Sequence, residues 1–185
     1  MDETLLGQTV LQSSVSEFER YKTLADGALK QISGKEWFDL PASENNSVAM
    51  LVKHVAENLR SRWTDFLTSD GDQPNRNRDA EFEFTQTDTL EALLQIWQVG
   101  WQTLFSALES LEPIDLARSI SIRGQPHSIA GAIQRSLGHT AYHVGQIVQL
   151  TKQIRGAEFQ NLSIPKGKSE AFYQERLQKR NLNRD

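Results

Sequence analysis

The stretch of sequence from Ser128 to Arg155 is SIAGAIQRSLGHTAYHVGQIVQLTKQIR, and its amphipathic pattern predicts a long helix. Mostly apolar side chains recur on one broad side of that helix, namely Ile129, Ile133, Leu137, Val144, Ile147, Val148, Thr151 and Ile154. His139 and His143 lie four residues apart at the edge of this side, so both imidazole rings can reach one point beside the helix. A divalent metal ion could occupy that point. A position at the edge of a core is also typical of residues that line a pocket.

The histidine pair has a simpler interpretation as well. Two histidines at helical spacing often lie at the polar edge of a helix or form a hydrogen-bonded pair in the core. A metal site is therefore predicted only if a third ligand can be found. Thr140 follows His139, whereas the usual zinc-protease helix has a glutamate there as general base. Peptidase chemistry of that kind is therefore not expected.

Three other long segments have apolar residues at helical spacing. With a short terminal helix, the further predicted helices cover residues 3–33, 47–68, 90–111 and 169–178. Asn46 or Ser47 can cap the second of the long helices. Asp88 and Glu91 can form a capping pair for the third. These helices must bury their apolar stripes against one another, which predicts a bundle.

The connections between these helices are predicted to carry little regular structure. Residues 69–87 are polar and rich in turn formers, and such long connections often cross a molecule or line a site. Local ion pairs can form there, although most of the side chains concerned are expected to be solvated, namely Arg76, Arg78, Asp79 and Glu81. Residues 114–127 alternate weakly, which predicts a short extended piece paired with residues 82–84.

The best third partner for the histidine pair is His54 on the second helix. It lies about 60° beyond Leu51 around that helix, beside the apolar face and near Asn58. For His54 alone, a solvent-facing or hydrogen-bonded histidine is the commoner explanation. Its edge position on a neighbouring helix nevertheless matches that of the pair. His127 is a poorer candidate, because it stands at a helix entrance with no partner at helical spacing.

The composition limits the classes of protein to which the chain can belong. With 185 residues it is expected to form one domain, residues 1–185, which needs no metal for folding, so any metal is expected to be functional. Zero cysteines leave imidazole, carboxylate and water to hold an ion. No membrane span and no signal peptide are recognised, so a cytoplasmic location is expected. The net charge of −4 gives no global field for gathering nucleic acid.

The helix order resembles a known superfamily. Four long helices, a long second connection, a histidine midway along the second helix and H-x-x-x-H on the fourth are similar to the DinB-like (YfiT-like) metal-dependent enzymes. The strings LVKHVAENLRSRWTDFL, NRNRDAEF, HTAYHVGQIV and LSIPKGKSEAF resemble one uncharacterised branch of that superfamily. The resemblance implies an all-α four-helix bundle with a long connection between helices two and three and a short C-terminal helix.

The same resemblance implies a function. Relatives hold a divalent ion with three histidines near one end of the bundle, and these carry over to His54, His139 and His143. The relatives are commonly dimeric, and characterised ones include transferases and isomerases that use low-molecular-weight bacterial thiols. The expected function is therefore transfer of such a thiol to a small electrophile by a homodimer. Zinc or nickel is the expected ion, because imidazole suits both.

The chemistry of a three-histidine site is compatible with catalysis. Three neutral imidazoles leave an exchangeable position, and a metal-bound water or thiol would be the reactive group, so no catalytic side chain is assigned. Arg135, one turn before His139, is a candidate to hold a carboxylate of the substrate. A fourth ligand from Asp79 or Glu81 would instead close the site. The alternatives are a non-catalytic metal- or ligand-binding, stress-associated protein and a metal-dependent hydrolase.

Overall fold

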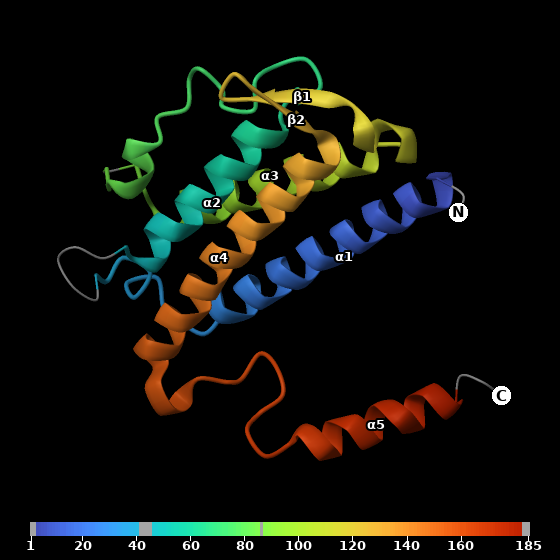
Figure 1. Cartoon of the computed structure of the whole chain (residues 1–185). Coiled ribbons are helices and arrows are strands. Elements are labelled where there is room, and N and C mark those ends of the chain that lie inside the picture. The colour runs from blue at the N-terminus through green and yellow to red at the C-terminus, as the bar shows by residue number, and fades with distance from the viewer. Residues whose placement is uncertain (1–2, 41–45, 86, 183–185) are drawn as a thin grey trace.

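The computed structural model describes residues 3–40, 46–85 and 87–182. Four long helices form the body of the molecule, and their limits are α1 Glu3–Leu29, α2 Val48–Trp63, α3 Leu90–Glu109 and α4 Ile129–Arg155. Two short strands and a last helix complete the main elements, namely β1 Ser119–Ile122, β2 Gln125–Ser128 and α5 Ser169–Leu182. The predicted all-α four-helix bundle is confirmed, with its long connection between α2 and α3 and its short C-terminal helix (Figure 1).

The core of the bundle joins helices that pack in two close pairs. α2 packs mainly on α3 and α1 mainly on α4, and α2 also contacts α4. The α2–α3 approach needs a glycine, because a Cβ at Gly100 would lie 2.6 Å from the carbonyl oxygen of Ala56. Trp97 and Trp101 are fully buried beside it, with ring centroids 5.5 Å apart. The Trp97 indole donates a hydrogen bond to Asp26 on α1, which ties the two pairs together.

Side-chain caps set the starts of α2 and α3. Ser47 caps α2 by accepting a hydrogen bond from the backbone N–H three residues on, as predicted. The predicted capping pair of Asp88 and Glu91 is wrong, because Thr89 caps α3 instead. Asp88 precedes the cap and accepts a hydrogen bond from the ammonium group of Lys53.

The first two helices end earlier than predicted. α1 ends at Leu29 and α2 at Trp63, whereas their apolar patterns continue to residues 33 and 68. Ile32 and Phe66 lie beyond these ends and are still buried in the core. A turn that packs against the core therefore carries the same spacing of apolar residues as a helix.

The segment predicted as extended is a hairpin. β1 and β2 pair antiparallel, with Ser119 opposite Ser128 and Ile122 opposite Gln125. The predicted pairing with residues 82–84 is wrong, because the strands pair with each other and residues 79–82 form a 3-10 turn.

The hairpin turn is fixed to the α2–α3 connection by Asp70. Arg123 and Gly124 form the turn with φ of 54° and 68°, in the left-handed region. The Asp70 carboxylate accepts hydrogen bonds from the Ser121 hydroxyl and from both turn N–H groups. These hydrogen bonds, that from Ser121 first, hold the pKa of Asp70 well below its usual range. The long connection and the hairpin therefore form one covering layer at this end of the bundle.

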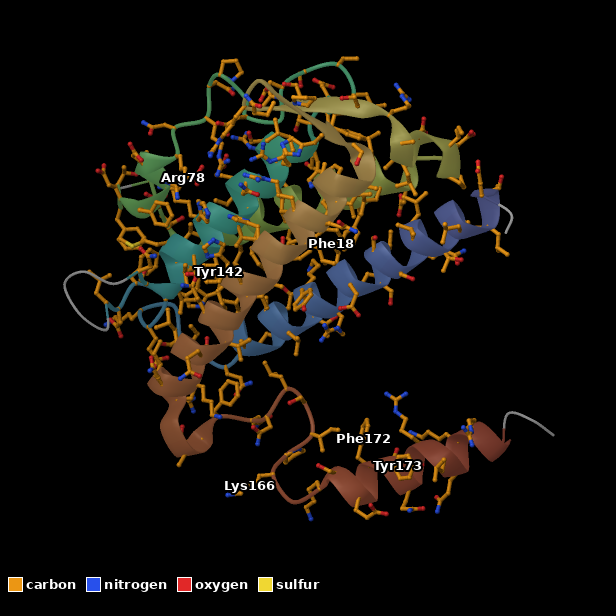
Figure 2. All side chains as sticks on the ribbon, in the orientation of Figure 1. Phe18, Arg78, Tyr142, Lys166, Phe172 and Tyr173 are labelled. Atoms are coloured by element: carbon orange, nitrogen blue, oxygen red, sulfur yellow. The ribbon has the colours of Figure 1, made fainter. Side chains whose placement is uncertain are left out.

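Helix α5 lies apart from the four-helix body (Figure 1). Figure 2 shows Phe172 and Tyr173 on this helix, where both are exposed, in contrast to the buried Phe18 of α1. No helix in the described part of the chain is long and apolar enough to cross a membrane.

Candidate metal centre

His54 on α2 lies together with His139 and His143 on α4. One nitrogen from each ring lies within 4.8 Å of the other two, and the Nε2 atoms of His54 and His139 are 3.1 Å apart. Two nitrogen ligands of one tetrahedral zinc ion are about 3.4 Å apart when each bond is about 2.1 Å long. The three histidines could therefore hold a metal ion. The fourth histidine, His127, lies on β2 and does not belong to this group.

The long α2–α3 connection fixes the orientation of His54. Nδ1 of His54 donates a hydrogen bond to Glu81 at 2.7 Å. The buried Arg76 donates to both oxygens of the same carboxylate, at 2.7 and 3.0 Å. Donation from Nδ1 selects the tautomer in which the lone pair is on Nε2, the atom that faces His139. We refer to Arg76, Glu81 and His54 as the loop anchor.

The loop anchor changes two expectations. His54 is not at the edge of the core, as its helical position predicts, but is only 2% exposed, because the connection covers it. Neither candidate for a fourth ligand belongs to the histidine cluster. Asp79 is exposed, and the Glu81 carboxylate is occupied by His54 and Arg76. Glu81 therefore supports a candidate ligand and leaves the three-histidine set open.

His143 is oriented from within α4. Its Nδ1 donates a hydrogen bond to the Gln146 side-chain oxygen at 2.7 Å. The ring of Tyr142 packs edge-on against the imidazole, with centroids 4.9 Å apart. Figure 2 shows Tyr142 on α4, where its side chain is exposed. Nε2 of His143 is therefore also left with its lone pair available to an ion.

The protonation states around the cluster suit a cation. Burial, and then the neighbouring His143 and His54, lower the pKa of His139 to about 3. Burial also lowers the pKa of His143, by more than the hydrogen bond to Gln146 raises it. Burial raises the pKa of Glu81, but hydrogen bonds from His54 and Arg76 outweigh it, and the net pKa is lowered. Neutral imidazoles beside an ionised carboxylate are the states that metal binding requires.

A cavity of about 280 Å³ opens beside His54 and His139. Asn58 and Ser136 line it, together with five arginines, namely Arg62, Arg76, Arg78, Arg123 and Arg135. Arg135, the predicted substrate contact, is thus one of several cations in the wall. An arrangement of this kind can bring an anionic molecule next to the histidine cluster.

The arginine least expected from the sequence is Arg62. It is 7% exposed, and its Nη1 is buried without a hydrogen-bond partner among the described residues. Burial lowers its pKa to about 10, so the guanidinium remains charged at neutral pH. The sequence does contain a signal for it, because His54, Asn58 and Arg62 follow one another at four-residue spacing on α2. Arg76 and Glu81 have no such regular spacing; the local ion pair considered for them forms, but the two side chains are buried and not solvated.

Comparisons with known proteins give a family and a fold. A family model described as "Protein of unknown function (DUF1572)" matches residues 6–168. The crystal structure of the DinB-like protein YjoA from Bacillus subtilis matches 80% of this chain and 96% of its own, with a TM-score of 0.59 and 20% sequence identity. At that identity the likeness shows the fold alone. No curated protein matches the chain significantly. The predicted resemblance to an uncharacterised DinB-like branch is confirmed.

Proposed function

We propose, since the chain belongs to the DUF1572 family of proteins of unknown function and has a DinB-like fold, that it is a metal-dependent enzyme that transfers a low-molecular-weight thiol to a small electrophile. The observation that carries the proposal is the convergence of His54, His139 and His143 beside a cavity. In the transfer, the thiol loses its proton to solvent water, its sulfur bonds to the electrophilic carbon, and the leaving group departs with the electrons of the bond that breaks.

The residues of the chain divide the work of such a site. A divalent ion, zinc or nickel, when bound by the three histidines, supplies Lewis-acid chemistry and promotes ionisation of a thiol or water. Glu81 and Gln146 orient His54 and His143 through their Nδ1 atoms. Among the described residues, the carboxylate that contacts the cluster is that of Glu81, and it is already hydrogen-bonded by Arg76. It is therefore poorly placed to act as a general base, which favours a nucleophile supplied from outside the protein.

Metal content tests the ligand set. We expect one zinc or nickel ion per chain after purification without an affinity tag, and loss of that ion in the double variant His139→Ala, His143→Ala. His127→Ala is the matched control, because His127 lies on β2 outside the cluster, and it should keep the ion. Equal metal content in the double variant and the parent protein would contradict the proposed metal site.

Turnover tests the reaction. The zinc- or nickel-loaded protein is screened with cellular thiols and a chromogenic electrophile, and product formation is followed by absorbance. Activity should disappear on chelation and in His143→Ala, and persist in His127→Ala. Hydrolysis of an ester or amide by the same preparation, without thiol transfer, would replace the transferase proposal with a metal hydrolase. Bound metal with neither activity would favour the non-catalytic binding protein.

The proposal also includes a cytoplasmic homodimer with a small-molecule substrate. Zero cysteines are compatible with a reducing compartment. Dimerisation is expected from the family resemblance, and light scattering across micromolar concentrations measures it directly. A constant monomer mass would contradict the dimer and leave the metal site unaffected.

A further inference from the structure

The cavity beside the histidines concentrates positive charge in an acidic chain. The chain has a net charge of −4, yet five arginines line one cavity. Two of them are paired with carboxylates, Arg76 with Glu81 and Arg123 with Asp72 at 3.0 Å. The other three, Arg62, Arg78 and Arg135, form no direct ion pair among the described residues, although the negative charge of Asp72 acts on Arg62 without contact. Burial lowers the pKa of Arg62 most, and the positive charges of Arg76, Arg123 and Arg135 lower it further, so a bound anion would offset their repulsion.

Arg62 is the most buried of the three arginines that form no direct ion pair. Its Nη1 is shielded from water and lacks a hydrogen-bond partner among the described residues, a state that is unfavourable for a charged group. Arg62 also lines the cavity, so an anion bound there would lie beside the guanidinium group and offset its charge. The guanidinium is therefore placed as a ligand contact and not as a stabilising ion pair.

Other donors surround the same space. Ser136 accepts a hydrogen bond from the Trp63 indole at 3.2 Å, so its own hydroxyl hydrogen can be donated into the cavity that it lines. Arg78, labelled in Figure 2, comes from the long connection, where its guanidinium lies 5.5 Å from the centroid of the Phe82 ring. Arg135 comes from α4 and is exposed. Donors from three elements thus face one site.

We propose that this cavity binds a small dianion, a phosphate monoester or a dicarboxylate, with Arg62 as the inner contact and Arg78 and Arg135 as the outer contacts. Two negative charges match the three cations that form no direct ion pair better than one does. His54 and His139 line the same cavity, so such a dianion would be the substrate of the proposed enzyme, and this part of the inference rests on the proposed function. Binding of the anion itself depends on the arginines and needs no metal.

Calorimetric titration of the metal-free protein tests the anion site. Inorganic phosphate, succinate and acetate are titrated separately at constant ionic strength. We expect at least one dianion to bind at least tenfold more tightly than acetate, and weaker binding as salt is raised. Tighter binding of phosphate identifies a phosphate ester as the substrate class, and tighter binding of succinate identifies a dicarboxylate. If neither dianion binds more tightly than acetate, the proposal is overturned.

Arg62→Met separates binding from folding. Methionine keeps most of the side-chain volume and removes the charge, so the preferred dianion should bind about 10- to 100-fold more weakly. The melting temperature should stay the same or rise, because a buried unpartnered charge is removed. Arg20→Met is the control, since Arg20 is exposed on α1, pairs with Glu17 and does not line the cavity. Equal affinities in the two variants would contradict the assignment of Arg62.

The outcomes for metal and anion are independent. A protein that binds the dianion through Arg62 but never binds a divalent ion loses the proposed function and keeps the anion site. A protein that binds the ion through the three histidines but no dianion keeps the metal centre and loses this inference.

Discussion

Glu81 and Arg76 are charged groups that could not be buried alone. The Glu81 carboxylate accepts the His54 Nδ1 hydrogen and two hydrogen bonds from Arg76, and all three side chains are almost fully shielded from water. Removing one member of a buried ion pair leaves the other charge uncompensated. The loop anchor therefore makes the orientation of His54 depend on the seating of the connection.

Glu81→Gln tests the loop anchor. The amide cannot carry the charge that balances Arg76, so the free energy of unfolding should fall by about 1–3 kcal/mol. Zinc affinity, measured by competition with a chelator, should fall about 10- to 100-fold, because the support of His54 is weakened. Glu83→Gln is the control, since Glu83 is exposed two residues further on and should leave both quantities unchanged. Unchanged zinc affinity in Glu81→Gln would show that the anchor does not position His54.

His139 makes the stability of the metal-free protein depend on pH. Its pKa is about 3 in the folded chain, against 6.5 for an ordinary histidine. Between these values the unfolded chain binds a proton that the folded chain does not, so protonation favours unfolding. The free energy of unfolding is therefore highest above pH 6.5 and decreases as the pH falls. We expect the urea midpoint to decrease from about pH 7 to about pH 5. His139→Gln should flatten that decrease, and an unchanged slope would exclude His139 as its cause.

At the scale of elements, the helices could be predicted and the loop contacts could not. Every long helix follows from apolar spacing, because a helix that buries one face repeats its apolar residues at the helical period. The predicted helix from Ser128 to Arg155 agrees with α4, except that Ser128 is the N-cap. His139 and His143 follow from the same period. The contact between His54 and Glu81 spans 27 residues and depends on how an aperiodic connection folds. The turn at Asp79–Phe82 and the arginines of the connection, Arg76 and Arg78, were missed for the same reason.

The α2–α3 contact gives a prediction with an internal control. Gly100→Ala places a methyl group against the Ala56 backbone and should separate the two helices, at a cost of about 1–3 kcal/mol in unfolding free energy. Gly145→Ala on α4 meets nothing within 4 Å. It should stabilise the protein by about 0.5–1 kcal/mol through helix propensity. Chemical denaturation measures both, and equal effects would mean that the packing at Gly100 is loose.

At the scale of the whole molecule, stability resides in the four-helix body. The buried apolar core extends through α4 to Ile147 and includes no residue of α5 within the described chain. The family match also ends at residue 168, before α5 begins. The last helix therefore contributes little to the packing that holds the histidines.

Deletion of residues 169–185 tests this division. The thermal midpoint should change by less than about 2 °C, as for a loss of surface contacts worth about 0.5 kcal/mol or less. The metal content of the shortened chain should equal that of the full chain. A large drop in the midpoint would mean that α5 packs on the body, and light scattering on both proteins would show whether it does so within one chain or between two.

Arg123 in the hairpin turn is unfavourable for stability and favourable for the proposed anion binding. Arg123 holds φ of 54°, a conformation that costs a residue with a side chain roughly 1 kcal/mol and that asparagine or glycine adopts more easily. Its guanidinium lines the cavity, so the residue that strains the turn also contributes charge where the dianion is proposed to bind. Arg123→Asn should raise the melting temperature and weaken dianion binding together. A laboratory search for heat-resistant variants would then discard this arginine early, and a search for catalytic variants would retain it.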